Sequence, residues 1–199
     1  MKPSAATSPG NRATPETARI SEASDRLREF LDAWAAAQPD ADTAAALNAD
    51  LAAWSERLRP FATEEAHQLF APLPDPGRAP PMVPRLVVEA NDATQTRGSV
   101  TFGRYFLGGN GAVHGGAISL LFDDIMGRLA HAGGRKSART AYLHVDYRSI
   151  ARIEKHLTVR AWVESEEGRK RMMRAELHDD ETLCAEARAL FVVLNPGQP

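Results

Sequence analysis

The stretch GAVHGGAISLLFDDIMGRLA, residues 111–130, decides how the rest of this chain is interpreted. Its apolar side chains recur every three or four residues, which predicts a helix over 115–131 with one buried face. The residues on that face are Ile118, Leu121, Phe122, Ile125 and Leu129. Two features do not serve folding: the helix starts with His-Gly-Gly, where Ser, Thr or Asp would cap better, and it carries two adjacent aspartates.

Strand-like segments lie on both sides of this helix. Two precede it, at 85–90 and 99–106, and four follow it, beginning at positions 139, 156, 169 and 183. In the later segments apolar and polar residues alternate, which is typical of an antiparallel sheet with one covered face. In the first of them, the side chains expected to face the core are Ala141, Leu143, Val145 and Tyr147. We expect a four-strand meander whose apolar face is covered by the helix, which is an α+β fold.

The first 84 residues have a different character. Residues 1–20 are rich in Pro, Ser, Thr and Ala and predict a flexible tail, whereas 21–70 predict helices, the second with Thr43 as its N-cap. The apolar stripes of these helices are Leu27, Phe30, Leu31 and Trp34, and Leu47, Leu51, Trp54 and Leu58. Residues 71–84 contain six prolines and predict a stiff linker. The remaining residues, 85–199, form the second domain.

The composition excludes several classes of protein. The chain has 199 residues and a formal net charge of −2, without the basic excess of nucleic-acid-binding proteins. No apolar stretch reaches the ~18 residues that cross a bilayer, and the N-terminus lacks the apolar core of a secretory signal. The single cysteine, Cys184, excludes an internal disulfide. We therefore expect a cytoplasmic protein with no nucleic-acid partner and no membrane span.

The two aspartates of the helix have different surroundings. Asp124 has Arg128 four residues later, which predicts an ordinary solvated ion pair. Asp123 has only small neighbours at helical spacing, namely Ser119, Gly127 and Ala130. Because small residues let another backbone come close, we expect Asp123 to lie in a helix-to-helix contact, as a base or nucleophile with a perturbed pKa. The alternative is an aspartate on an ordinary helix surface.

His114, Gly115 and Gly116 stand where the backbone N–H groups of a helix lack intrahelical partners. These groups carry partial positive charge, and a glycine lets a substrate carbonyl approach them closely. The N–H of Gly115 is therefore a candidate oxyanion donor. A phosphate-binding loop is the rival hypothesis, but neither a G-x-G-x-x-G pattern nor a Gly-Lys-Ser/Thr ending is present.

The spacing of Gly115 and Asp123 has a consequence for assembly. Eight residues of helix span about 12 Å, whereas a donor and a base that act on one carbonyl each lie within about 3 Å of it. The two groups of one chain cannot serve the same site. Two helices that run antiparallel about a two-fold axis bring Gly115 of one chain to Asp123 of the other. The residues thus predict a homodimer with two shared sites.

The order of elements and the motif VHGGAISLLFDD, residues 113–124, resemble the hotdog-fold acyl-CoA thioesterases of the phenylacetate type. The resemblance covers about residues 85–194. In that family a glycine N–H polarises the thioester carbonyl, an aspartate activates water or attacks directly, and a Ser or Thr on the next strand positions the nucleophile. The resemblance assigns these roles to Gly115, Asp123 and Thr140, and it implies neither a metal nor an organic cofactor.

The resemblance also implies how the substrate is held. Many relatives carry Asn or another polar group six residues before the motif histidine, where this chain has Gly108, and the nearest amide is Asn110. We expect His114 to orient the loop, and Asn110 and Gly116 to contact the substrate. CoA phosphates need cations, and relatives bind CoA near the end of the strand that begins at Thr140. The cations there are Arg148, Arg152 and Lys155.

Two functions fit these residues. The first is the hydrolysis of acyl-CoA thioesters in sites shared between two chains. The second is a non-catalytic protein of the same fold that binds acyl-CoA or another acyl chain, which the glycine at position 108 favours. The helices over 21–70 either cap the acyl-binding tunnel or mediate assembly, and the dimers could pair into tetramers.

Overall fold

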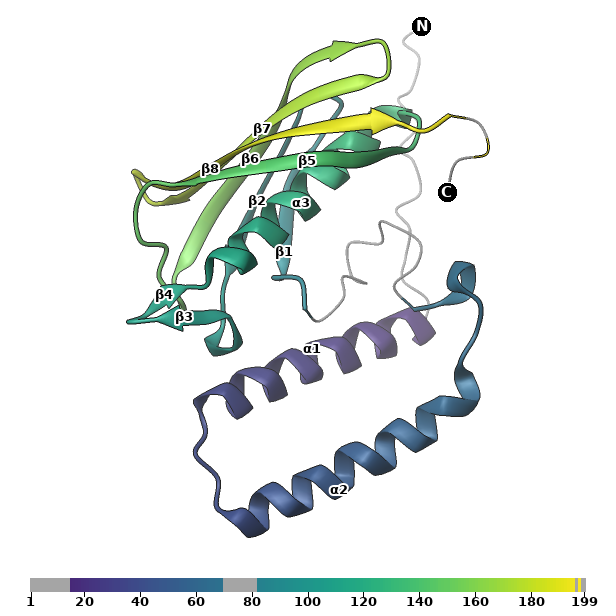
Figure 1. Ribbon diagram of the computed structural model, residues 1–199, viewed down its shortest axis with the longest axis vertical. Helices are drawn as coiled ribbons and strands as arrows, with labels where there is room; N and C mark the ends of the chain where they lie inside the picture. The colour runs from purple at the N-terminus through teal and green to yellow at the C-terminus, as the bar shows by residue number, and fades with distance from the viewer. Residues whose placement is uncertain (1–14, 70–81, 196, 198–199) are drawn as a thin grey trace, which may run out of the picture.

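The computed structural model describes residues 15–69, 82–195 and 197 (Figure 1). Six strands form one antiparallel sheet, and helix α3 (Gly115–His131) lies against one face of it. The strands are β1 (Leu86–Asn91), β2 (Gln95–Thr101), β5 (Ala138–Tyr147), β6 (His156–Glu167), β7 (Lys170–Asp179) and β8 (Thr182–Val193). This arrangement confirms the expected α+β fold.

The core lies between α3 and the covered face of the sheet. All five residues of the predicted apolar face of α3 are buried, and Phe122 and Ile125 are fully so. The strands meet them with alternating residues, among them Leu157, Val159, Ala161, Met173, Ala175, Leu177, Ala187, Ala189 and Phe191. Each large apolar side chain that is fully buried here stabilises the fold by roughly 1.5–3 kcal/mol.

The order of the strands differs from the expected meander. The order is β1-β2-β6-β7-β8-β5, so β5 pairs with β8 instead of β6. Alternation determines which side chains face the core, but it carries no information on which strands are neighbours. As a result β5 lies at an edge of the sheet, and no strand among the described residues pairs with its outer side.

A β-bulge in β5 turns one polar side chain toward the helix. Thr140 lies opposite Phe191 and Tyr142 lies opposite Leu190, so Ala141 is an extra residue in this strand. Because side chains alternate, one inserted residue reverses the facing of those before it. Phe191 is buried under α3, so Thr140 faces the helix as well. The expectation that Ala141 faces the core is wrong: it is exposed.

A short hairpin leads into α3. Strand β2 ends at Thr101, and Arg104–Phe106 form a 3-10 turn, so the strand expected over 99–106 is correct only in its first part. Strands β3 (Leu107–Gly109) and β4 (Ala112–Val113) follow as a two-stranded sheet. The hairpin delivers the chain to the N-terminus of the helix.

Helix α1 (Pro15–Ala36) is attached to the sheet domain by polar contacts. The backbone N–H of Tyr105 donates to Asp32 over 2.9 Å. The Asp32 carboxylate also fills the space beside Gly103, where a Cβ would lie 2.0 Å from an oxygen, so any larger residue there would displace this carboxylate. Helix α1 includes residues 15–20, which the sequence assigned to a flexible tail. The predicted linker falls mainly on residues outside the described ranges.

Helix α2 (Ala41–Leu58) buries none of its residues in this chain. Its N-cap is Asp40, whose side chain accepts from the N–H of Thr43 over 2.8 Å, so Thr43 is not the cap that the sequence suggested. Leu51, Trp54 and Leu58 are 49%, 58% and 63% exposed. In Figure 1 this helix is the element farthest from the sheet, with α1 between them.

Candidate active site

Asp123 and Thr140 come together although they lie on different elements. The hydroxyl of Thr140 on β5 donates to Oδ1 of Asp123 on α3 over 2.9 Å. This contact depends on the bulge, because a regular strand would turn Thr140 away from the helix. Asp123 is exposed, so its second oxygen is accessible to water or to a substrate. The arrangement suits a carboxylate that accepts a proton or attacks an electrophile.

Asp124 has a structural role that the sequence analysis underestimated. Its Oδ2 lies 3.0 Å from Nε of Arg128, as the spacing predicts. However, the two side chains are only 12% and 8% exposed, so the pair is buried and the expectation of a solvated pair is wrong. Removing either partner would leave a buried charge without compensation.

His114 caps the helix and leaves one backbone donor free. Its Nδ1 accepts from the N–H of Gly116 over 3.0 Å, and its carbonyl accepts from the N–H of Ala117 over 2.9 Å. Within the described residues no acceptor meets the N–H of Gly115. That group is therefore the unsatisfied donor of the first turn, at the end of α3 that carries partial positive charge.

The geometry of the hairpin before α3 explains why positions 108 and 110 are Gly and Asn. A Cβ on Gly108 would lie 2.8 Å from Cα of His114, so an amide side chain does not fit there unless His114 moves. Asn110 and Gly111 connect β3 to β4 with φ values of 48° and 75°. Positive φ at two successive residues is typical of a tight hairpin turn, for which Asn-Gly is preferred. The turn alone explains Asn110, and its contact with substrate stays a prediction.

The three predicted CoA-binding cations lie in two settings. Arg148 forms an ion pair with Glu186, and the hydrogen bond between them raises the pKa of the guanidinium. Arg152 and Lys155 line a hollow of about 620 Å³, which they share with acidic residues of the β7–β8 turn such as Asp180. A backbone bridge joins Arg152 to Ala112, so this hollow adjoins the segment that enters α3.

The strip of small residues beside Asp123 is only partly available to a second helix. Ala130 is fully buried in this chain, so the expectation that it lines an open strip is wrong. Gly127 has no heavy atom within 4 Å of the place where its Cβ would lie. Ser119 lies 3.2 Å from the hydroxyl of Tyr147, which also donates to the carbonyl of Gly115 over 2.8 Å.

Tyr147 is a candidate site residue that the sequence analysis missed. Its place on the helix-facing side of β5 was expected, but as packing only. The residue is 54% exposed and its hydroxyl reaches the first turn of α3. Its position could have indicated this role, because Tyr147 is the last helix-facing residue of the strand that carries Thr140 and it bears a hydroxyl.

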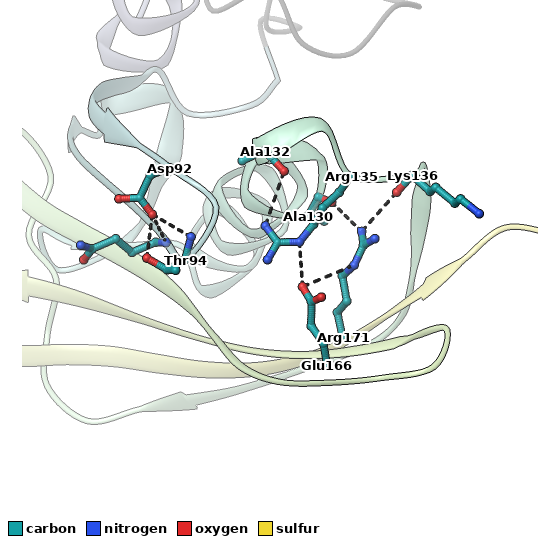
Figure 2. Close-up of polar contacts among 9 residues, drawn as sticks. Asp92, Thr94, Ala130, Ala132, Arg135, Lys136, Glu166 and Arg171 are labelled. Atoms are coloured by element: carbon teal, nitrogen blue, oxygen red, sulfur yellow. Dashed lines mark hydrogen bonds and ion pairs between the residues drawn. The ribbon is translucent and has the colours of Figure 1, made fainter.

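The opposite end of α3 is held by a second polar cluster (Figure 2). Nη1 of Arg171 donates to the carbonyls of Ala130 and Lys136 over 2.6 and 3.2 Å. Oε1 of Glu166 forms ion pairs with Nε of Arg135 over 2.7 Å and with Nε of Arg171 over 3.7 Å. Arg171 is 7% exposed, and its burial lowers the pKa of its guanidinium. This side chain from β7 satisfies a carbonyl in the last turn of the helix and keeps α3 in place on the sheet.

Two further kinds of site were sought in the part of the chain that the structure describes. There, no group of three or more His, Cys, Asp or Glu side chains is arranged to hold a metal ion. No described helix combines the length and apolar character needed to cross a bilayer.

The comparison with known protein families points to this same part of the molecule. Residues 110–186 match the model of the thioesterase superfamily. The matched segment contains His114, Asp123, Thr140 and Tyr147, so the geometry described above lies within the matched residues.

Individual thioesterase relatives extend this result. The chain is 33% identical to the acyl-coenzyme A thioesterase THEM4 of Rattus norvegicus over 99 residues, which are 49% of this chain and 42% of the relative. It therefore spans less than half the length of the curated relatives it matches. A solved thioesterase superfamily protein is 26% identical and covers 94% of both chains with a TM-score of 0.74. This likeness extends beyond the sheet domain into the N-terminal helices.

Two other solved structures match the sheet domain. A phenylacetic acid degradation-related protein from Ralstonia eutropha JMP134 is 27% identical over 54% of this chain and 84% of its own, with a TM-score of 0.50. A thioesterase protein of Streptococcus pneumoniae TIGR4, solved with coenzyme A, is 16% identical over 55% and 86%, with a TM-score of 0.52, and shows the fold alone. The hotdog fold and the resemblance to phenylacetate-type thioesterases are thereby confirmed.

Proposed function

We propose that this protein hydrolyses acyl-CoA thioesters. The match to the thioesterase superfamily and the likeness to the THEM4 acyl-coenzyme A thioesterase support the reaction class. The observation that carries the proposal is the 2.9 Å hydrogen bond between Thr140 and Asp123. It joins an exposed carboxylate to a hydroxyl from the neighbouring strand, which holds the carboxylate in one orientation.

The reaction can follow either of two routes through Asp123. As a general base, the carboxylate takes a proton from water while the water oxygen adds to the acyl carbon. As a nucleophile, the carboxylate adds to the acyl carbon itself and forms an anhydride, which water then hydrolyses. In both routes the C–S bond breaks and the thiolate of CoA leaves. The free N–H of Gly115 stabilises the negative charge on the carbonyl oxygen.

The site is proposed to form between two copies of the chain. Gly115 and Asp123 are separated by about 12 Å along α3, too far to act on one carbonyl. When two α3 helices run antiparallel, Gly115 faces Asp123 of the partner subunit and position 119 faces its own copy. Ser119 is small enough for that contact. Beside it, no strand of the residues that the structure describes pairs with the outer edge of β5, so this edge offers backbone groups to a second chain.

Bound CoA is proposed to extend from the helix N-terminus toward the hollow at the β5–β6 connection. A neighbour of the same fold was solved with coenzyme A, which supports this class of ligand. Arg152 and Lys155 are the cations of that hollow, whereas Arg148 is engaged with Glu186. We therefore assign phosphate binding to Arg152 and Lys155 before Arg148.

The test is a panel of acyl-CoAs with a thiol reagent that reports released CoA. Wild type should release CoA, and Asp123→Asn should lower kcat by about 10²-fold or more, because the variant cannot accept a proton or form the anhydride. Asp146→Asn is the matched control, since Asp146 lies on the outer face of the same strand that carries Thr140. Its rate should equal that of wild type.

Other outcomes would decide against parts of this proposal. Binding of acyl-CoA by wild type without release of CoA would favour the alternative, a binding protein of the same fold. Release of CoA at an unchanged rate by Asp123→Asn would show that the hydrolase does not use this carboxylate. A monomeric, fully active enzyme in light scattering would exclude the shared site.

A further inference from the structure

Helix α1 meets the sheet domain at the 3-10 turn that precedes β3. This turn, Arg104–Phe106, is closed by the N–H of Phe106, which donates to the carbonyl of Gly103 over 3.1 Å. From α1, the carboxylate of Asp32 accepts the N–H of Tyr105 over 2.9 Å. The same carboxylate occupies the space that a Cβ on Gly103 would need. The side chain of Asp32 is therefore seated directly on this turn.

The turn is also bonded to the residue that begins α3. The carbonyl of Phe106 accepts the N–H of His114 over 2.8 Å. The carbonyl of His114 in turn accepts the N–H of Ala117 over 2.9 Å, and it belongs to the same planar peptide unit as the N–H of Gly115. Because that unit is rigid, the placement of His114 determines the direction of the Gly115 N–H, which is the proposed oxyanion donor.

The other side of the turn is held without any help from α1. Nε and Nη2 of Arg104 donate to the two carboxylate oxygens of Glu154 over 3.0 and 3.1 Å. The segment that carries Arg152 and Lys155 is joined to the hairpin before α3 by backbone contacts in which α1 takes no part. Loss of the Asp32 carboxylate would thus loosen the turn toward His114 and leave the cations of the hollow in place.

We infer that Asp32 is a positioning residue, which aims the N–H of Gly115 at the thioester carbonyl through the turn Arg104–Phe106 and through His114. This inference rests on the proposed hydrolase function. Asp32 touches none of the reacting atoms and serves as the acceptor for one backbone donor of the turn. Displacement of a reacting group by about 1 Å can cost up to about 10²-fold in rate, so a small shift of the turn is enough to matter. The N-terminal helix is in this way part of the catalytic apparatus.

The test compares two aspartates of α1 in the full-length chain. Asp32→Ala should lower kcat by about tenfold and keep KM within about twofold of wild type, because the donor shifts while the binding cations do not. Asp32→Asn retains an oxygen that can accept the Tyr105 N–H, so its kcat should lie within about twofold of wild type. Asp25→Ala is the control, since Asp25 attaches the same helix through ion pairs with Arg28 and Arg85, each over 3.3 Å. It should keep the wild-type kcat at a temperature where circular dichroism shows it folded.

A second variant acts on the same contact from the side of the turn. The φ value of Gly103 is −77°, which alanine adopts without strain, but an alanine Cβ would displace the Asp32 carboxylate. Gly103→Ala should therefore lower kcat as much as Asp32→Ala. Because both changes break one contact, the double variant should be no slower than either single variant.

Several outcomes would overturn the inference and leave the hydrolase assignment intact. These are a wild-type kcat in Asp32→Ala or in Gly103→Ala, an equal loss of kcat in Asp25→Ala, and additive losses in the double variant. A loss of kcat in Asp32→Ala that is equally large in Asp32→Asn would have the same meaning. A wild-type protein that releases no CoA would overturn both the inference and the proposed function.

Discussion

Helices α3 and α2 are nearly equal in length, but α3 is packed in the core whereas α2 is exposed in this chain. Helix α3 has 17 residues, nine of them buried, whereas α2 has 18 residues and buries none in this chain. Both were predicted from the same kind of apolar stripe. The comparison shows that a 3.6-residue period identifies the face a helix can bury, while the partner that covers this face is determined elsewhere in the molecule.

The largest effect is expected in the middle of α3. Phe122→Ala should lower the free energy of unfolding by about 3–5 kcal/mol, because it removes a fully buried ring and leaves a cavity under the sheet. Urea denaturation followed by circular dichroism measures the change. A loss below about 1 kcal/mol would mean that α3 is not the centre of the core.

A smaller effect is expected where α3 ends. Arg171→Met should destabilise the protein by about 1.5–3 kcal/mol, because the carbonyls of Ala130 and Lys136 lose a charged donor. The same denaturation experiment applies, with Arg188→Met as the control, since Arg188 is exposed on the neighbouring strand. Equal effects of the two variants would show that the cluster in Figure 2 contributes nothing specific.

The smallest effect is expected in α2. Trp54→Ala should change the free energy of unfolding by less than about 0.5 kcal/mol, because this ring is 58% exposed and alanine favours helix. Denaturation at two protein concentrations gives the measurement. A loss above about 2 kcal/mol that grows with protein concentration would break the comparison with α3, since it would mean that a second chain covers α2 in solution.

The sequence predicts the fold well where periodicity decides and poorly where chain topology decides. The apolar face of α3 and the alternating faces of the later strands followed from the spacing of their residues. The pairing of β5 with β8 could not be predicted in this way, because pairing with β8 and pairing with β6 would bury the same side chains of β5. The burial of the Asp124–Arg128 ion pair could not be predicted either. The spacing of the two residues indicates the pair, but it does not show which elements cover it.

Most residues of the candidate site were predicted from the sequence, but the contacts between them were not. The motif identified His114, Gly115 and Asp123, and the resemblance added Thr140, which the structure places against Asp123. Tyr147 was missed, because its importance lies in a contact between the end of a strand and the start of a helix. Such contacts depend on the packing of two elements and leave no local pattern in the residues themselves.

The extra residue at Ala141 shifts the alternation of side chains along β5 by one position. Upstream of it the strand alternates out of step with the part downstream, so residues 140 and 147, an odd number of positions apart, nonetheless point to the same helix. Straightening β5 at Ala141 while keeping every residue would restore strict alternation and send one of those two hydroxyls to the opposite side. The placement of both hydroxyls beside α3 thus depends on the backbone path of β5 as well as on the identity of the two side chains.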